Sequence, residues 1–378
     1  MDRTRPDGTP LRTGYTTGAN ACAAACAATR LLVGLELEPW EGPLPELTAD
    51  RYDTLAGSVR ITLPNGEAVR FPVRVAERRD DAAWASVIKD GGDDPDCTHR
   101  AEHWAEVRLR DDGVVELHGG RGVGTVTKPG LGLPVGGPAI NPVPRQNITE
   151  EVAKLAPGGA DVIIGITDGE ELAKKTLNAR LGIVGGLSVL GTTGIVHPYS
   201  TAAFRASVAQ GIDVARNLGA QHVVLTTGGR SERFAMELLP DLPEPAFVQM
   251  GDFCGYALNH AASVGMRGAT IVGMIGKLSK MADGRTMTHA AGSEVNTALL
   301  AEVARGVGAD DALCDAIAAA NTGRHVQELV AVAGLPGFFD ALCERVSVVL
   351  SAHVKSPIRI DVFLVDFSGP ALGRYPHV

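Results

Sequence analysis

The sequence has few aromatic residues and no excess of positive charge. Phe, Trp and Tyr make up 4% of the 378 residues, and 35 Lys and Arg stand against 44 Asp and Glu, which gives a net charge of −9. So few rings make a stacking platform for single-stranded nucleic acid hard to build, and an acidic chain does not attract a polyanion through its mean field. We therefore expect no nucleic-acid partner, although a locally basic pocket for a small anion stays compatible with this balance.

Cysteine pairs with the spacing of a metal or redox site are also lacking. None of the six cysteines forms a CxxC pair, which disfavours a zinc or dithiol site. Cys22 and Cys26 share a helix face in an alanine-rich run, and small packing residues explain them better than metal ligands do. The first ten residues are polar, without the apolar stretch of a signal peptide or membrane span. We expect reduced thiols, no resident metal, no membrane contact and a cytoplasmic location.

The overall composition is typical of a globular protein with more than one domain. Hydrophobic residues make up 45% and charged residues 21% of the chain, and 378 residues exceed the ~100 to 200 that one domain usually contains. We predict an α+β domain with an antiparallel sheet over residues 1–150. An α/β domain with a largely parallel sheet is predicted over residues 151–378.

Mixed patterns in the first half indicate one helix and several strands. An alanine-rich run predicts a helix over residues 19–32. Alternating apolar residues on both sides of Asn65-Gly66 predict a β-hairpin. Further strands are predicted over residues 84–89 and 104–110, and Asp112-Gly113 predicts a second hairpin turn into residues 114–117. The glycine- and proline-rich segment from Gly119 to Arg145 is predicted to be a long, ordered loop.

From about residue 161, short apolar runs alternate with helical patterns. Continuous apolar strands that alternate with helices predict a doubly wound, largely parallel sheet. The tail over residues 293–352 is helical by spacing, and residues 358–365 alternate as a final strand. The predicted strands before that tail cover residues 162–166, 183–190, 222–225, 246–250 and 269–274.

Three common catalytic motifs are absent. No G-x-G-x-x-G closes a strand and opens a helix, which disfavours a Rossmann dinucleotide site. Gly276-Lys277 superficially suggests a phosphate loop, but Ile271 stands where that loop needs glycine and Leu278 where it needs Ser or Thr. No G-x-S-x-G elbow is present, so hydrolase chemistry of that kind has no support.

Loops at the ends of predicted strands offer a ligand site. The candidates are Gly273 to Lys277, Thr226 to Arg230 and Thr167 to Glu170. In open α/β sheets, ligands lie outside the carboxyl ends of strands, where helix N-termini attract anions. Lys277 in such a position would meet an anionic substrate. The alternative is a solvated surface lysine beside ordinary turns.

Acidic and histidine residues add candidates for proton transfer. The segment from Lys89 to Asp96 holds four carboxylates in seven residues, and without EF-hand order a turn with solvated charges is favoured over a cation site. His289 and His197 are candidates for proton transfer at neutral pH, although a lone histidine is more often simply hydrogen-bonded.

Several long strings resemble the cobalt-precorrin-5B C1-methyltransferase family of anaerobic cobalamin biosynthesis. The resemblance covers nearly the whole chain. It is carried by residues 11–18 (LRTGYTTG), 87–96 (VIKDGGDDPD), 122–136, 138–145, 170–176, 182–186 and 276–280 (GKLSK).

The resemblance implies methyl transfer from S-adenosylmethionine to C1 of a cobalt-containing corrinoid, giving cobalt-precorrin-6A, with a fold unlike that of the usual tetrapyrrole methylases. Such a substrate carries many carboxylates, so Arg and Lys should gather at its site. We expect the macrocycle in a cleft roofed by residues 119–145. The expected substrate contacts are Arg121, Lys128, Arg145, Arg230 and Lys280.

Cofactor and catalytic residues are assigned on the same expectation. Methyl transfer is an in-line displacement that positioning and a dry pocket can accelerate, and a base can help to generate the nucleophilic carbon. The residues expected to bind S-adenosylmethionine are Thr226, Thr227, Gly228, Gly229, Gly273, Gly276 and Asp168. The catalytic candidates are His289, Asp90, Asp93 and Lys277.

Two other function classes stay open. The chain could bind and carry a corrinoid without catalysis, in which case it would have no affinity for S-adenosylmethionine. A nucleotide phosphotransferase that uses Lys277 is already weakened by Ile271 and Leu278. The sequence also leaves open whether the chain forms a homo-oligomer.

Overall fold

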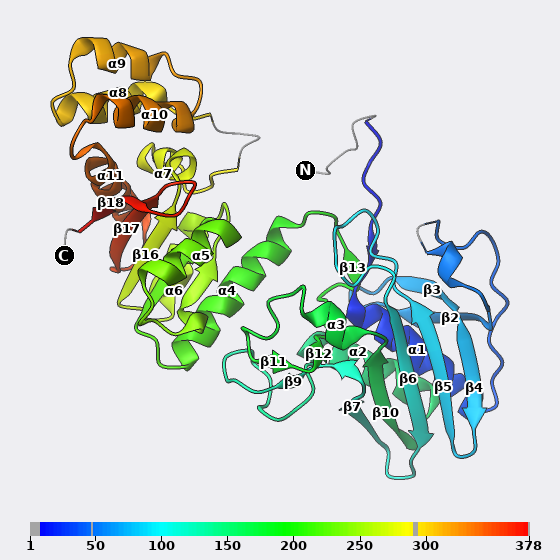
Figure 1. Cartoon of the computed structure of the whole chain (residues 1–378). Coiled ribbons are helices and arrows are strands. Elements are labelled where there is room, and N and C mark those ends of the chain that lie inside the picture. The colour runs from blue at the N-terminus through cyan, green and yellow to red at the C-terminus, as the bar shows by residue number, and fades with distance from the viewer. Residues whose placement is uncertain (1–7, 47, 290–293, 377–378) are drawn as a thin grey trace. The chain divides into compact units, whose positions relative to one another are not determined.

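The computed structural model describes residues 8–46, 48–289 and 294–376, and the chain divides into two compact units (Figure 1). The first unit is Met1–Ser200 and the second is Thr201–Val378. The division falls later than the predicted boundary at residue 150. The reason is that residues 162–166, which we predicted as the first strand of the parallel sheet of the second domain, lie in a strand (Gly159–Ile166) inside the sheet of the first unit.

The first unit is built on a five-stranded sheet. Its pairs are antiparallel except for the parallel pair of β10 and β7. In sheet order the strands are β4 (Val75–Arg79), β5 (Ala82–Ile88), β6 (Glu102–Leu109), β10 (Gly159–Ile166) and β7 (Val114–Gly119).

The predicted hairpin between residues 104–110 and 114–117 is wrong, because β10 lies between β6 and β7. Val162, Ile164 and Ile166 of β10 are fully buried, whereas most residues of β7 are at least partly exposed. An interior position in the sheet therefore suits the apolar strand, and the more polar strand takes the edge.

Two helices pack together and against strands of this sheet. Helix α1 (Thr17–Leu32) begins where the Thr16 side chain accepts a hydrogen bond from Ala19 N, and its alanines are buried beside β5 and β6. Helix α2 (Pro142–Leu155) packs against α1. It includes Arg145, so the predicted irregular segment ends earlier than expected. Pro142 opens the helix because proline lacks only an N–H that the first turn would leave unpaired.

Short elements complete the first unit. The predicted hairpin is confirmed as β2 (Gly57–Thr62) and β3 (Ala68–Val73). The remaining elements are β1 (Gly14–Tyr15), η1 (Ala49–Arg51), β8 (Gly122–Val123), β9 (Thr125–Val126), α3 (Gly169–Ala173), β11 (Ile183–Val184), β12 (Gly186–Leu187) and β13 (Ile195–Val196).

The glycine-rich segment is ordered by close approach of backbone to backbone. Strand β8 pairs with β12, and β9 pairs with β11. A Cβ on Gly122 would lie 1.9 Å from the carbonyl oxygen of Ile166, and one on Gly124 would lie 2.3 Å from Ile183 Cγ2. Glycine is therefore required at these two positions by packing within the unit.

The second unit contains a largely parallel sheet. Strands β15 (Phe247–Gln249), β14 (His222–Thr226), β16 (Gly268–Gly273) and β17 (Arg359–Val365) are parallel and follow one another in that order. Strand β18 (Ala371–Tyr375), which the sequence pattern did not indicate, adds to β17 in the antiparallel sense. The predicted parallel sheet therefore starts at β14.

The connections of this sheet change direction at β14. Helix α5 (Gly229–Leu238) leads from β14 to β15 on one side, and α6 (Cys254–Ser263) leads back past β14 to β16 on the other. Phe234 of α5 packs with Val224 and Val272 on one face. On the opposite face, α6 packs in a separate cluster with α4 (Thr201–Asn217), α7 (Ile275–Ala282) and α11 (Phe338–His353). The carboxyl ends of β14 and β16 thus flank a topological switch point.

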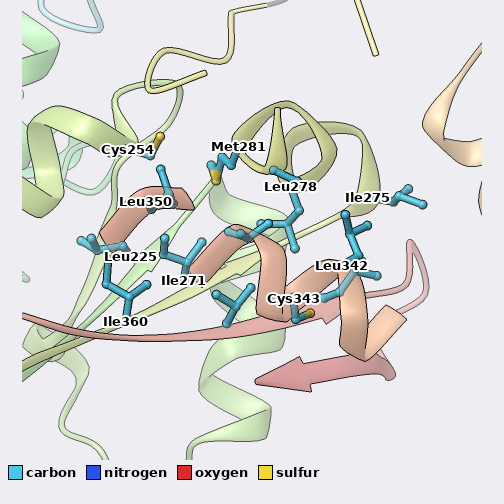
Figure 2. Packing of buried hydrophobic residues seen from close by; sticks show 14 of the residues in the cluster. Leu225, Cys254, Ile271, Ile275, Leu278, Met281, Leu342, Cys343, Leu350 and Ile360 are labelled. Carbon is cyan, nitrogen blue, oxygen red and sulfur yellow. The ribbon is translucent and has the colours of Figure 1, made fainter. Parts of the chain in front are cut away.

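A large apolar core joins the sheet to the C-terminal helices. Figure 2 shows Leu225 and Ile271 of the sheet in one cluster with Leu278 of α7 and Leu350 of α11. Helices α8 (Thr297–Gly306), α9 (Asp311–Ala318) and α10 (Gly323–Ala333) extend this cluster, and η2 (Glu244–Ala246) precedes β15. Across the described ranges, no helix is both long and apolar enough to cross a membrane.

Candidate functional site

Polar side chains and two glycines gather where β14, β15 and β16 end. We call these residues the strand-end cluster: Thr227, Gly228, Ser231, Asp252, Gly273, Lys277 and Thr288. Thr227 and Gly228 follow β14, Asp252 follows β15, and Gly273 ends β16. Because ligands of open α/β sheets bind outside the carboxyl ends of strands at a switch point, this is the place in the second unit where a ligand is expected.

Lys277 connects two of these loops. Its Nζ donates a hydrogen bond to the carbonyl oxygen of Thr227 at 2.9 Å and lies 3.1 Å from Asp252 Oδ1. The side chain is 35% exposed, and that of Asp252 is 22% exposed. Lys277 is therefore not the solvated surface lysine of the alternative interpretation. Its charge is compensated by Asp252 within the unit.

Thr288, in the segment that follows α7, contacts Asp252. Thr288 Oγ1 donates to Asp252 Oδ1 at 3.0 Å, and Thr288 N donates to the carbonyl oxygen of Asp252 at 3.0 Å. Lys280 Nζ reaches the carbonyl oxygen of Thr288 at 3.5 Å, and Lys280 is only 9% exposed. His289 is exposed and follows directly on Thr288. His289 is therefore adjacent in sequence to Thr288, a member of the strand-end cluster.

The loop after β14 is fixed by hydroxyl groups. Ser231 Oγ donates to the carbonyl oxygen of Gly228 at 2.8 Å and lies 3.1 Å from Thr227 Oγ1. Since the Ser231 proton is used at Gly228, Thr227 is the donor in the second contact. Glu232 accepts a hydrogen bond from Gln249 Nε2 at 2.7 Å. These contacts connect the first turn of α5 to the ends of β14 and β15.

Most of the residues predicted to bind the cofactor lie near one another at the strand ends. Thr226 and Asp168 are the exceptions. Thr227 N donates to the carbonyl oxygen of Val272, next to Gly273, so the two loops are neighbours. Thr226 is fully buried, and its Oγ1 points to the carbonyl oxygen of Val248. Asp168 belongs to the first unit, where it precedes α3 with a φ of 58°. It is therefore not part of the strand-end cluster.

The acidic segment of the first unit differs from the predicted turn with solvated charges. Lys89 is 1% exposed, and its Nζ lies 2.6 Å from Asp96 Oδ2. Burial opposes ionisation of Asp96, but the charge and hydrogen bond of Lys89 outweigh it, and the pKa of Asp96 is lowered. The segment is an internal ion-pair network rather than a solvated face.

Asp90 is held by Arg12 from the preceding motif. Arg12 Nη2 donates to Asp90 Oδ1 at 2.8 Å, Arg12 Nη1 contacts Oδ2, and Gly92 N donates to Oδ1 at 2.9 Å. Burial would raise the pKa of Asp90, yet these hydrogen bonds hold it below its usual value. Asp93 Oδ2 accepts from Arg12 N at 2.7 Å. This geometry gives both predicted catalytic carboxylates an anchoring role in the loop.

Two motif segments, residues 11–18 and 87–96, meet residues 190–194 at the start of α1. Tyr15 N donates to the carbonyl oxygen of Asp90, Thr16 N to that of Gly194, and Gly18 N to that of Leu190. A Cβ on Gly14 would lie 2.1 Å from the carbonyl carbon of Gly91. Strings that are far apart in the sequence therefore pack backbone to backbone in the first unit.

The five predicted substrate cations are divided between the two units. In the first unit, Arg121 has an 88% exposed side chain, with Nε 3.7 Å from Glu170, and Lys128 Nζ lies 3.4 Å from the carbonyl oxygen of Arg180. Arg145 is half-buried on α2. In the second unit, Arg230 is exposed at the start of α5, whereas Lys280 is buried.

One group of side chains in the described residues has metal-like spacing. Ligand atoms of Glu116, His118 and Asp161 lie within 4.8 Å of one another. Arg110 Nη1, however, lies 2.6 Å from Asp161 and 3.3 Å from Glu116. A guanidinium already neutralises these exposed carboxylates, so the group is an ion-pair network on the sheet.

Sequence reasoning missed Asp252, Ser231 and Thr288. The signal for Asp252 was present, because Gly251-Asp252 directly follows the predicted strand over residues 246–250. The rule that picked the loops after the neighbouring strands applies equally to this one. Ser231 and Thr288 carry no comparable signal, since only the folded contacts bring them to the strand ends.

The fold and this site define a mixed α/β protein in two units, with several sheets and a polar cluster at a sheet switch point. The chain belongs to the CbiD family. The CbiD family model matches residues 4–198, and the model of the CbiD C-terminal domain matches residues 287–376.

Named relatives resemble the chain over its whole length. A protein of Polaromonas naphthalenivorans named cobalt-precorrin-5B C(1)-methyltransferase is 51% identical over 384 residues, covering 100% of both chains. A protein of the same name from Leptospira interrogans is 48% identical, covering 97% of this chain and 96% of its own. A crystal structure of a cobalamin biosynthesis protein (cbiD) from Archaeoglobus fulgidus is 28% identical, covering 73% of this chain and 81% of its own with a TM-score of 0.39.

Proposed function

We propose that the chain is a methyltransferase that transfers a methyl group from S-adenosylmethionine to C1 of cobalt-precorrin-5B, giving cobalt-precorrin-6A in corrin ring synthesis. The observation that carries this proposal is the 51% identity, over the full length of both chains, to a protein named cobalt-precorrin-5B C(1)-methyltransferase. An enzyme of biosynthesis also agrees with six free thiols, which favour the reducing cytoplasm.

The strand-end cluster is the proposed cofactor site. S-adenosylmethionine supplies a methyl group bonded to a positively charged sulfur. The cluster offers a carboxylate at Asp252, hydroxyls at Thr227 and Thr288, and glycines at the ends of β14 and β16. Among the described residues, a Cβ on Gly228 or Gly276 would meet no heavy atom within 4 Å beyond the neighbouring backbone, so a ligand can approach the backbone at these positions. Gly229 and Gly273 belong to the same two loops.

Within the second unit, which holds the strand-end cluster, Arg230 and Lys280 are the proposed contacts for carboxylates of the corrinoid, and the cations of the first unit, Arg121, Lys128 and Arg145, are separate candidates. Guanidinium groups bind carboxylates through paired hydrogen bonds, so a polycarboxylate needs several such side chains. Arg121 is the most available of them, because its side chain is 88% exposed.

The reaction needs orientation and removal of a proton more than covalent catalysis. The C1 carbon forms a bond to the methyl carbon while the bond between methyl and sulfur breaks, and the electron pair of that bond stays on sulfur. Residues that align the two partners and exclude water can supply much of the acceleration. His289 is the proposed base, because it follows directly on Thr288 of the strand-end cluster, whereas Asp90 and Asp93 are engaged by Arg12.

The direct test uses cobalt-precorrin-5B and S-adenosylmethionine carrying an isotopically labelled methyl group. Anaerobic incubation with the full chain should give a product with one added label by mass spectrometry, and NMR should locate that label at C1. Corrinoid binding without transfer or affinity for S-adenosylmethionine would contradict the proposal and favour a carrier. ATP binding at the same site would favour a phosphotransferase.

A further inference from the structure

We propose that Asp252 is the acceptor for the two ribose hydroxyls of the nucleoside cofactor, and that Lys277 and Thr288 position its carboxylate. Neither Asp252 nor Thr288 is among the residues that the sequence motifs assign to the cofactor. The inference rests on the proposed function, since it names the part of the cofactor that one side chain of the strand-end cluster would recognise.

The position of Asp252 in the chain is the first argument. Dinucleotide-binding sheets place glycines after one strand, and an acidic residue after the next strand, about 20 residues on, accepts the ribose hydroxyls. Here Gly228 and Gly229 follow β14, and Asp252 follows β15, which pairs directly with β14 in parallel. The G-x-G-x-x-G spacing is absent, but the order of glycines, helix, strand and carboxylate is the same.

The second argument is the hydrogen bonding and the exposure of the Asp252 carboxylate. The contacts from Lys277 Nζ at 3.1 Å and Thr288 Oγ1 at 3.0 Å are both made at Oδ1. Among the described residues, no hydrogen bond is made at Oδ2, which is left as an acceptor for a ligand. The side chain is 22% exposed, so it is reachable yet held in one orientation. A vicinal diol presents two hydroxyl donors, and a fixed carboxylate with spare acceptor capacity is complementary to it.

The neighbouring acid is a weaker candidate. Glu232 lies on the first turn of α5, but it is 7% exposed and its Oε2 accepts from Gln249 Nε2 at 2.7 Å. Its burial leaves little of the carboxylate for a ligand to reach. Asp252 is the carboxylate that a ligand at these strand ends can reach with its existing contacts intact.

Lys277 is a positioning residue in this scheme. It bridges the carbonyl oxygen of Thr227 and Asp252 Oδ1, so it holds the loop after β14 at a fixed separation from the loop after β15. Removing its charge should loosen the carboxylate without removing the acceptor. An arginine at this position keeps the charge and the donors, and it should restore part of the lost function.

The test measures binding of S-adenosylhomocysteine and of its 2′-deoxyribose and 3′-deoxyribose analogues to the full chain by calorimetry. Wild type should bind the ribose form more tightly than either deoxy form. D252N should weaken binding of the ribose form roughly 10- to 100-fold, as expected for hydrogen bonds to a charged group. The same variant should bind the deoxy forms with nearly wild-type affinity, so that the preference for ribose is lost.

Matched variants separate this role from general damage. D311N removes a carboxylate whose side chain is 92% exposed on α9 and should leave all three affinities unchanged. K277M should reduce the preference for ribose, and K277R should recover part of it. If D252N keeps the wild-type preference for the ribose form, Asp252 does not bind the ribose hydroxyls, and the proposed function still stands. If wild type binds none of the three compounds, the proposed cofactor itself is wrong.

Discussion

Lys89 Nζ lies 2.6 Å from Asp96 Oδ2, and the lysine side chain is only 1% exposed. Asp96 is 25% exposed and also accepts from the backbone N–H of Thr98 at 2.8 Å and from its hydroxyl at 2.7 Å. The buried ammonium of Lys89 therefore depends on this ion pair more than the carboxylate of Asp96 does. In the described part of the chain, the ammonium has one carboxylate partner, whereas the carboxylate has other donors and contact with water.

Removing Asp96 should cost more stability than removing Lys89. D96N leaves a buried ammonium without a counter-charge, which should destabilise the first unit by about 3 to 5 kcal/mol. K89M leaves a carboxylate that keeps Thr98 and solvent, so its cost should be clearly smaller. Urea unfolding followed by amide exchange in β5 and β6 measures both. Equal losses in the two variants would show that the pair is not the asymmetric, buried contact described.

The second prediction concerns Gly92, whose φ is +67° and whose Cβ, if present, would lie 2.3 Å from the carbonyl oxygen of Arg12. G92A should destabilise the first unit by about 3 kcal/mol or more, because backbone strain and a backbone clash act together. Gly66 is the matched control, since its φ is +88° with no atom within 4 Å of an added Cβ. G66A should cost roughly 1 kcal/mol through φ alone, measured by the same exchange experiment.

The third prediction is a pH dependence that arises from His103. The residue is fully buried, and burial followed by the nearby charge of Lys89 lowers its pKa to about 3. A histidine with a lowered pKa stabilises the fold above its unfolded value near 6.5, and this contribution is lost as the pH falls toward 3. Wild type should therefore lose about 1.4 kcal/mol per pH unit below 6.5 from this group.

The comparison that isolates this effect is the difference between wild type and H103L as a function of pH. The variant cannot bind the proton, so its stability should fall less steeply between pH 6.5 and 4 when exchange is followed in β6. His103 Nε2 has no hydrogen-bond partner in the described part of the chain, so the substitution does not orphan another group through that atom. Parallel curves for the two proteins would contradict the assignment.

Local patterns predicted the elements, while long-range pairing decided where they belong. Alternation around Asn65-Gly66 and the apolar runs that became β14 and β16 were sufficient, because both signals lie within about ten residues. The place of β10 between β6 and β7 depends on a contact across 50 residues that no local pattern encodes. For the same reason, the apolar run over residues 162–166 was predicted to be the first strand of the second sheet.

The candidate site was predicted to the level of its loops rather than its atoms. The rule that ligands bind at strand ends selected the segments around Thr227 and Lys277, and in the structure these two segments are neighbours. It could not tell that Lys277 is already compensated by Asp252, because an ion pair between loops depends on the sheet order. It could not distinguish Asp168 either, since that strand also ends in a loop but belongs to the other unit.

The last prediction separates His289 from Asp90 as the base of the proposed reaction. The carboxylate of Asp90 is engaged by Arg12 and its pKa is lowered, so it is a poor proton acceptor near neutral pH. H289Q should reduce kcat for methyl transfer by roughly 10²-fold or more, the usual contribution of a positioned base. The same variant should bind S-adenosylhomocysteine as wild type does and should lose the acidic limb of the kcat profile against pH.

H197Q, the same substitution at an exposed histidine of the first unit, should leave kcat unchanged, whereas D90N should lower stability and keep the shape of the pH profile. An unaltered profile in H289Q, or an equal loss of kcat in H197Q, would exclude His289 as the base.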